Sequence, residues 1–350
     1  MYQQDKRLWF FGVITLCFSL AMSEAAEPRK YAGDLSWSEG AASLALMNGD
    51  VIVWQFNHLQ DGKEKGAPYF HPLAALDGAV LTALRPGDHL WHRGLRFAWK
   101  KINGLEGYWT WPDGKKKWPD KKMGHTDVVT VKVTVNDDFS ARFDLELSYH
   151  PPGEPADLTE KRVITVSAPD ENGNYQIDWH AVFTAGAKGA VLDRTPIEGE
   201  PDGKWFGGYA GLQFRLAGHE QVAAWTISNS EGAKVRSEAD KISKVTRKSL
   251  QPMHGKPARW VDLYLDGEDG KNGGVVIMDH PGNFRHPSPW HVAAMPHEFH
   301  HAPLFEGPFT LDAGKKMHFD FRIVIHPDRA DKIFLEKRWK GFSARPVVDP

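Results

Sequence analysis

The strongest constraint on the fold is a two-residue alternation of apolar and polar side chains that recurs along the chain. Residues 128–135 read VVTVKVTV and residues 141–149 read ARFDLELSY. Such alternation predicts strands with one buried and one exposed face. Clusters of Gly, Pro, Asn and Asp separate these segments, as expected of turns. The same pattern predicts further strands at 162–166, 175–183, 211–216, 260–265, 274–278 and 317–325.

Many short strands with little helix predict an all-β fold, a large antiparallel β-sandwich. One helix is expected at 330–339, with Ile333, Phe334 and Trp339 on its buried side. Strands and helices do not alternate, which argues against a parallel α/β sheet. No repeat or linker divides the chain, so residues 27–350 are expected to form a single domain.

The N-terminus has the layout of a secretory signal peptide, which we predict to cover residues 1–26. Lys6 and Arg7 precede an uncharged run at 8–22, and small residues up to Ala26 offer a cleavage site. The run is shorter than the roughly 20 residues of a transmembrane helix. No later run approaches that length, so we expect no membrane span in the mature chain. The predicted location is periplasmic or secreted.

Composition narrows the possible chemistry. Cys17 is the only cysteine and lies in the predicted leader, which excludes thiol nucleophiles and thiolate metal ligands from the mature chain. Lys and Arg total 43 against 45 Asp and Glu, without a basic tail, which argues against a nucleic-acid partner. The unusual features are 14 Trp and 17 His. Indole faces stack on sugar rings while polar groups bind the hydroxyls, so a carbohydrate ligand is expected.

A first cluster of candidate site residues combines imidazoles, a guanidinium and indoles. His89 and His92 stand three residues apart, a spacing that diverges on a strand and converges on a turn. Arg93 offers a bidentate donor to a carboxylate or to paired hydroxyls. Trp109 and Trp111 provide flat platforms for a sugar. The predicted members of this cluster are His71, His89, His92, Arg93, Trp109, Trp111 and His125.

A second cluster follows the strand predicted at 274–278. Its prolines prevent regular structure and predict a rigid loop. His280 and His291 are expected to act in acid–base chemistry, and Asn283 and Trp290 to bind substrate.

Three further residues with ionisable side chains follow the second cluster in the sequence. Glu306 sits in a hydrophobic loop, a setting that suits a general acid. His300 and His301 are weaker candidates, because adjacent imidazoles point apart on a strand.

Four short segments together resemble the PmoA-like family of unknown function. They read YFHP at 69–72, DHLWHRG at 88–94, DHPGN at 279–283 and PWH at 289–291. The resemblance extends over nearly the whole mature chain. Family members more often carry His-Pro-His-His-Arg-Gly at the second segment. This chain matches the first His, the last His and the Arg there, and has Leu-Trp in place of Pro-His.

The resemblance implies an exported bacterial protein from polysaccharide-degrading lineages. It also implies a large antiparallel β-sandwich similar to the galactose-mutarotase supersandwich. The family label suggests methane oxidation, but membrane methane monooxygenase subunits need several spanning helices, and this sequence has no such run after its leader.

The sequence therefore predicts an exported carbohydrate-active enzyme, a hydrolase, lyase or epimerase acting on a glycan fragment. Its imidazoles would exchange protons or bind a divalent metal. Ordinary glycoside hydrolysis needs two opposed carboxylates, and Glu160 with Glu306 is a weak pair. The main alternative is a non-catalytic glycan-binding protein. A metal-dependent oxygenase using Asp88, His89 and His92 is least favoured, because adjacent side chains diverge.

Overall fold

The computed structural model describes residues 33–59, 66–87, 89–109, 123–218, 222–238, 247–292 and 298–347. The predicted leader, Asp88 and Trp111 lie outside these ranges. The named strands pair antiparallel throughout, which confirms the all-β sandwich expected from the sequence. The closer likeness to galactose mutarotase stays a prediction.

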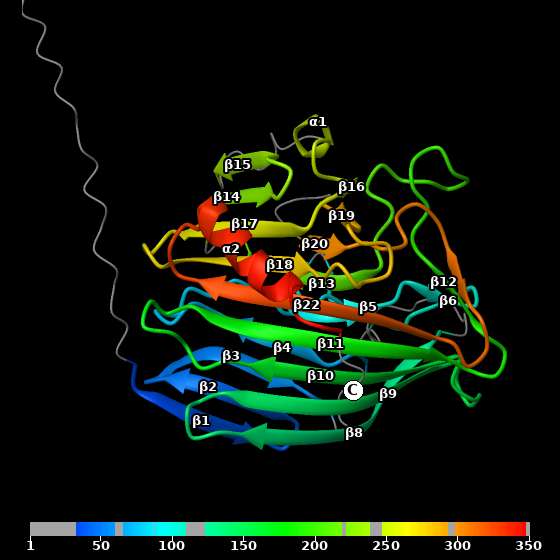
Figure 1. The fold of residues 1–350 in the computed structure, drawn as a ribbon, viewed down its shortest axis with the longest axis horizontal. Helices are drawn as coiled ribbons and strands as arrows, with labels where there is room; N and C mark the ends of the chain where they lie inside the picture. The colour runs from blue at the N-terminus through cyan, green and yellow to red at the C-terminus, as the bar shows by residue number, and fades with distance from the viewer. Residues whose placement is uncertain are drawn as a thin grey trace, which may run out of the picture.

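Two nine-stranded sheets form the body of the molecule. The first sheet contains, in spatial order, β1 (Leu35–Gly40), β2 (Ser43–Asn48), β3 (Val51–Asn57), β4 (Tyr69–Leu73), β5 (Leu95–Ala98), β13 (Gly211–Arg215), β20 (Glu298–His301), β19 (Pro289–His291) and β16 (Lys256–Pro257). The second sheet contains β15 (Lys234–Glu238), β14 (Val222–Asn229), β17 (Trp260–Gly267), β18 (Asn272–Asp279), β22 (Lys316–His326), β11 (Tyr175–Ala185), β10 (Leu158–Val166), β9 (Ala141–His150) and β8 (His125–Val135). Figure 1 shows the second sheet in front, from β15 at the top to β8 at the bottom, with the first sheet behind it.

The hydrophobic core fills the space between these two sheets. On β9 every second residue is buried, as the alternating sequence predicts. Phe143 of β9 packs against Phe56 of β3 with ring centroids 4.6 Å apart, and Phe97 of β5 lies 5.6 Å from Phe319 of β22. Each of these pairs joins the two sheets, so the sandwich is closed by side chains from strands far apart in the sequence.

A smaller four-stranded sheet lies at one end of the sandwich. It contains β21 (Phe309–Leu311), β12 (Ala190–Asp193), β6 (Lys101–Ile102) and β7 (Leu105–Glu106). The described helices are the short α1 (Arg247–Leu250) and α2 (Lys332–Ser343). Within the described ranges, neither helix is long and apolar enough to cross a membrane.

Helix α2 packs on the outer face of the second sheet (Figure 1). Its first turn is capped by Asp331, whose carboxylate accepts a hydrogen bond from the backbone N–H of Phe334. Leu335 and Phe342 are its buried side chains. The expectation that Ile333 is buried was wrong, since this side chain is 80% exposed. At 100° per residue, Ile333 lies about 200° around the helix from Leu335 and faces away from the sheet.

Candidate functional site

A cavity of about 300 Å³ lies against the face of the first sheet that points away from the core. Strand alternation produces this face. Leu95 and Phe97 of β5 are buried in the core, whereas Arg96 and Ala98 between and beside them line the cavity. The volume is at the lower end of the ~300–1,000 Å³ that small-molecule sites occupy.

Four polar side chains form one straight row across this face. In the strand register Arg96 pairs with Gln213, Gln213 with His300, and His300 with His291. The row therefore crosses β5, β13, β20 and β19, and all its members line the cavity. Nε of Arg96 donates to Oε1 of Gln213 at 2.8 Å. Arg96 and Gln213, 117 positions apart in the sequence, are thereby held on neighbouring strands.

Glu298 stands at the centre of the polar contacts in the cavity. Its Oε2 accepts a 2.7 Å hydrogen bond from Nε2 of Gln213 and lies 3.1 Å from Nε2 of His300 and 3.2 Å from Nδ1 of His92. Burial alone would raise the pKa of Glu298, but the interactions with the His92 and His300 imidazoles outweigh it and hold the pKa well below its usual range. Glu298 is thus a largely enclosed carboxylate, with its side chain 12% exposed, between two imidazoles.

His92 reaches the carboxylate from a turn. The backbone N–H of His92 donates to the carbonyl of His89 at 2.9 Å, and the two rings stack with centroids 4.6 Å apart. The three-residue spacing therefore converges, as it does on a turn. Burial lowers the pKa of His92 to about 3, and the neighbouring Arg96 and Arg215 act in the same direction, against the opposing effect of Glu298. The imidazole is neutral at neutral pH.

The Nδ1 atom of His92 has two neighbours of opposite character. Oε2 of Glu298 lies 3.2 Å away and can accept a proton carried on Nδ1. Nη1 of Arg215 lies 3.3 Å away and can donate to an unprotonated Nδ1. The contact with Glu298 fits the neutral tautomer that is protonated on Nδ1, in which Nε2 is an acceptor. The contact with Arg215 fits the neutral tautomer that is protonated on Nε2, in which Nε2 is a donor. His92 is therefore placed to take up a proton or to release one.

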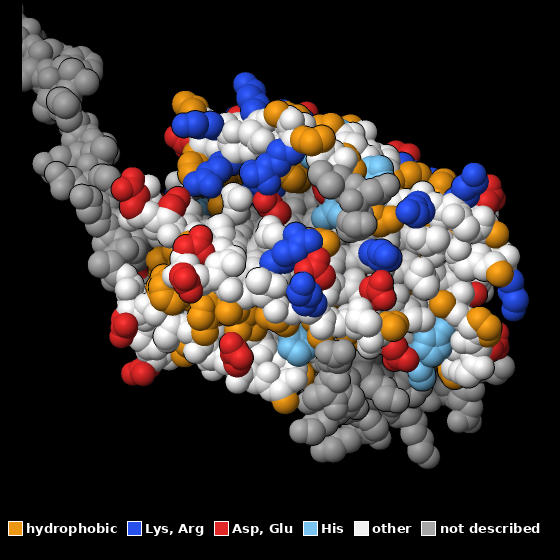
Figure 2. Space-filling model, turned by 60° about the horizontal axis from the view of Figure 1, so that its bottom comes forward, with side chains coloured by type: hydrophobic (Ala, Val, Ile, Leu, Met, Phe, Trp, Pro, Cys, Tyr) orange, Lys and Arg blue, Asp and Glu red, His pale blue; other side chains and the backbone are white. Residues whose placement is uncertain are grey.

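Positive charge exceeds negative charge among the described lining residues. Arg96, Lys100 and Arg215 line the cavity with the single carboxylate Glu298. Burial lowers the pKa of Arg96 to about 9. Burial also lowers the pKa of Lys100, and the carboxylate of Glu106, with Oε2 3.0 Å from Nζ of Lys100, opposes this shift. On the molecular surface shown in Figure 2, by contrast, Lys and Arg side chains are interspersed with Asp and Glu side chains. The cavity is locally suited to an anion.

Aromatic rings complete the cavity wall. Trp91, Trp109, Phe206 and Tyr209 line it. The carbonyl of Trp109 accepts from Nη1 of Arg96 at 2.9 Å, which ties this indole to the polar row. Nζ of Lys100 lies 4.3 Å from the centre of the Trp109 ring. An indole beside hydrogen-bonding groups is a common arrangement for binding a ligand that is polar at its edges and apolar on its faces.

His291 closes the row with an unusual environment. It is 1% exposed and stacks on Tyr209 with ring centroids 5.3 Å apart. Neither ring nitrogen has a hydrogen-bond partner among the described residues. Burial and the neighbouring His300 hold its pKa well below the usual value, so the ring is neutral. Buried polar atoms without partners are costly, and an adjacent cavity gives a ligand the means to satisfy them.

The structure brings four of the predicted site residues together and places the others elsewhere. His89, His92, Trp109 and His291 line the cavity, so members of the two sequence clusters meet in space. Trp111 lies outside the described residues. The remaining predicted residues, which are not among those lining the cavity, are His71, Arg93, His125, His280, Asn283, Trp290 and Glu306.

Residues of the first cluster outside the cavity make local contacts. Nδ1 of His71 lies 3.0 Å from Oγ1 of Thr82, and burial lowers the pKa of His71 to about 4. The guanidinium of Arg93 lies 5.2 Å from the centre of the Tyr69 ring. His125 packs near the His150 ring, with centroids 5.8 Å apart.

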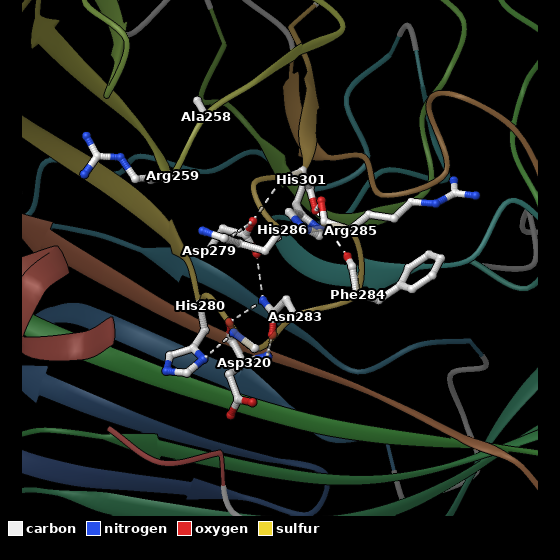
Figure 3. Close-up of polar contacts among 12 residues, drawn as sticks. Ala258, Arg259, Asp279, His280, Asn283, Phe284, Arg285, His286, His301 and Asp320 are labelled. Atoms are coloured by element: carbon white, nitrogen blue, oxygen red, sulfur yellow. Dashed lines mark hydrogen bonds and ion pairs between the residues drawn. The ribbon is translucent and has the colours of Figure 1, made fainter. Parts of the chain in front are cut away.

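Much of the second cluster surrounds one buried carboxylate, Asp279 (Figure 3). Oδ1 of Asp279 accepts from Nδ2 of Asn283 at 2.7 Å and lies 3.3 Å from Nε2 of His301. Oδ2 accepts from the backbone N–H of Ser288 at 3.0 Å and lies 2.8 Å from Nδ1 of His286. These contacts raise the acidity of Asp279, so that its pKa is lowered despite the opposing effect of complete burial. The loop 280–288 is thereby fixed to the end of β18.

The other members of the second cluster are also held by structural contacts. His280 accepts from the backbone N–H of Gly282 at 3.0 Å, and its Nε2 lies 3.1 Å from the carbonyl of Arg345. Trp290 is fully buried in the core and donates from Nε1 to the carbonyl of Ala258 at 2.8 Å. Glu306 is exposed at the surface.

Four central residues were not predicted, namely Arg96, Gln213, Arg215 and Glu298, and a fifth, His300, was only a weak candidate. Glu298 and His300 stand two apart on β20 and so share a face, and Gln213 and Arg215 do the same on β13. Polar residues at alternate positions of otherwise apolar strands were the available signal. Arg96, within LRFA of β5, carries the same signal.

A metal-binding role for the imidazoles stays a prediction. Within the part of the chain that the structure describes, no group of three or more His, Cys, Asp or Glu side chains has the arrangement of a metal site.

The fold and cavity define an antiparallel β-sandwich protein with a polar, aromatic-walled pocket on one sheet. The chain belongs to DUF6807, a family of unknown function, whose model matches residues 43–340. That description makes no reference to PmoA, so this part of the expected resemblance is not supported by the match. Comparison with curated proteins gives no match.

Proposed function

We propose that this protein is an exported carbohydrate-active enzyme that acts on the acidic sugars of a glycan fragment by proton transfer at carbon. The observation that carries the proposal is the Glu298 carboxylate held between His92 and His300 in a cavity with three cationic side chains. A uronate ring matches this cavity in two respects. Its carboxylate complements the excess positive charge, and its C–H faces suit the indole of Trp109.

The charge distribution favours a lyase or epimerase over an ordinary glycosidase. Glycosidases generally use two carboxyl groups on opposite sides of the scissile bond. Glu298 is the one carboxylate among the described lining residues. Glu160, expected as part of a weak pair, instead forms a fully buried ion pair with Arg162, with Oε1 2.6 Å from Nε. Imidazole at neutral pH suits removal of a proton from a carbon next to a carboxylate.

In the proposed reaction His92 is the base. With its Nδ1 proton directed to Glu298, Nε2 takes the C5 proton of the uronate. Glu298 stabilises the imidazolium that forms, and Arg96, Lys100 and Arg215 stabilise the negative charge that spreads onto the sugar carboxylate. Substrate binding brings an anion beside His92, which raises its pKa and strengthens it as a base.

Two outcomes then conserve atoms and electrons. In an epimerase, a solvent-derived proton is added to C5 from the opposite face, His92 later releases the proton that it removed to solvent, and no bond of the chain breaks. In a lyase, the C5 electron pair forms a C4=C5 double bond, the C4–O bond breaks, and the departing oxygen takes up a proton. Neither outcome requires an oxidant or reductant.

The proposal is tested by assaying the wild-type protein and Glu298→Gln on oligomers of galacturonate, glucuronate, mannuronate and guluronate. We expect turnover of at least one oligomer by the wild type, detected by NMR as unsaturated or epimerised sugar. Glu298→Gln should lose at least about 100-fold in kcat/KM, within the usual range for positioned acid–base groups. The alternative, a glycan-binding protein on the same fold, predicts tight binding of an oligomer without turnover.

A further inference from the structure

A second cavity lies beside the first. It has a volume of about 220 Å³, and Trp205, His254 and Phe305 form its aromatic wall. Glu198, Arg247 and Gln251 supply polar groups around it. The terminal nitrogens Nη1 and Nη2 of Arg247 donate to Oε1 and Oε2 of Glu198, and the distance from Nη1 to Oε1 is 2.6 Å. The chemistry of this cavity therefore repeats that of the first, with aromatic faces beside hydrogen-bonding side chains.

The two cavities share a wall. Trp205 lines the second cavity, and the next residue, Phe206, lines the first. Their rings meet edge to face with centroids 5.7 Å apart. A second pair of rings also belongs to the wall. His254 of the second cavity lies 5.2 Å from His291 of the first, measured between ring centroids. The two cavities are therefore adjacent, with the contacting ring pairs Trp205–Phe206 and His254–His291 between them.

The wall is fixed rather than loosely packed. Nδ1 of His254 accepts from the backbone N–H of Val292, the residue after His291, at 3.3 Å. The Phe305 ring is held between two glycines that both have positive φ, and a Cβ on Gly208 or Gly255 would lie 2.2 or 2.4 Å from ring atoms. Larger residues at these positions would displace the ring. The second cavity is therefore a preformed part of the fold.

Ligand chemistry is indicated by the side chains of this cavity. Trp205 is only partly buried, so part of its indole is available for stacking. Glu198 and Gln251 are exposed acceptors of the kind that bind sugar hydroxyls, and Arg247 is an exposed donor. Carboxylate and guanidinium groups that already pair with each other present remaining lone pairs and N–H groups to a neutral hydroxyl.

We propose that the second cavity binds the sugar next to the one that reacts, so that the substrate is a chain of at least two sugars spanning the Trp205–His254 wall. This inference rests on the proposed function, because it assumes that the first cavity holds a uronate. It adds a second subsite, with Trp205 as its stacking platform.

The test measures binding by calorimetry for the mono-, di- and trisaccharide of the uronate series that binds the wild-type protein. We expect the disaccharide to bind roughly tenfold more tightly than the monosaccharide, the gain of one good aromatic contact. Trp205→Ala should abolish this gain and leave monosaccharide affinity unchanged. Trp205→Phe should retain part of the gain, and Lys234→Ala, on exposed β15, should match the wild type.

Two other results would overturn the inference. Equal affinity of the wild type for the mono-, di- and trisaccharide would show that the second cavity is not a subsite. The proposal that the first cavity binds an acidic monosaccharide would still stand. Equal weakening of mono- and disaccharide by Trp205→Ala would show that this indole supports the first cavity only. Absence of binding by every uronate of every length would instead overturn the proposed function together with the inference. Thermal unfolding of each variant verifies that it is folded.

Discussion

His300 and His301 are adjacent on β20, yet His300 lines the cavity while His301 lies in the core with its Nε2 3.3 Å from Oδ1 of Asp279. The His301 ring contacts Phe321 of the second sheet, with centroids 4.7 Å apart. The strand thus has one imidazole on each face. Asp279 and its partners anchor the core side of β20, and this anchoring positions Glu298 and His300 on the other side.

Replacement of Asp279 by Asn should therefore cost stability. The substitution removes the buried charge that four donors surround and directs an NH2 group at some of them. We expect the free energy of unfolding to fall by about 3–5 kcal/mol, the usual cost of removing one partner from a buried charged network. Urea denaturation measures this. The matched control, Asp137→Asn in an exposed turn, should change stability by less than about 0.5 kcal/mol. Equal stability of the two variants would refute the anchoring role.

Two buried histidines, one from each cluster, distinguish the cavity from its supporting loop. His92 and His280 are 6% and 5% exposed. His92→Ala should lower kcat/KM at least about 100-fold, as expected for loss of a general base. His280→Ala should leave kcat/KM within about threefold of the wild type, because His280 contacts backbone groups outside the cavity. Steady-state kinetics on the uronate oligomer that the wild type turns over measure both effects. A larger loss of kcat/KM in His280→Ala than in His92→Ala would contradict the assignment of the site to this cavity.

The pH dependence of catalysis follows from the low pKa of His92. A base must be unprotonated to act, and the ring in the free enzyme takes up its proton only at about pH 3. The value of kcat/KM should accordingly stay level as the pH falls from 7 to about 5, where an unperturbed histidine would already be mostly protonated. Initial rates at low substrate concentration test this. A decline centred near pH 6.5 would contradict the assignment of His92 as the base.

Stability should fall as the pH is lowered. Burial depresses the pKa of His71 and of His254 to about 4 in the folded protein, whereas histidine in an unfolded chain titrates near 6.5. Between these values the unfolded state binds more protons, so stability is lost on acidification through this window. His71→Gln should reduce the slope between pH 6.5 and 4 by at most about 1.4 kcal/mol per pH unit. Urea titrations at several pH values give both slopes, and identical slopes would show that His71 titrates normally.

The sequence was most informative about strands that alternate cleanly. The segments at 128–135, 141–149 and 317–325 lie within β8, β9 and β22. The sandwich could be predicted because period two, together with turn residues, specifies antiparallel strands locally.

Which strands become neighbours was not available from the sequence, and the site depends on it. Gln213 and His300 meet only because β13 pairs with β20. The statement that adjacent imidazoles diverge on β20 was sound, but it did not show that one of them enters a cavity. Similarly, the polar loop after β18 looked like a site because a buried carboxylate needs many donors, whether it serves structure or chemistry.

The two faces of β11 show the same division between solvent and core. Asp178 and His180 pair with β22 on the outer face, Asp178 with Arg322 and His180 with Asp320. Trp179 between them is the residue that points into the core.

Exchange of the C5 hydrogen with solvent tests the central claim most directly. The wild-type protein is incubated in D2O with the uronate oligomer that it binds, and the sugar is examined by NMR and mass spectrometry. Proton transfer at carbon predicts deuterium at C5 of a recovered or epimerised sugar, or a C4=C5 product that has lost this hydrogen, with neither appearing for His92→Ala. Cleavage to saturated ends that retain the C5 hydrogen and carry one solvent oxygen would contradict the account and identify a hydrolase.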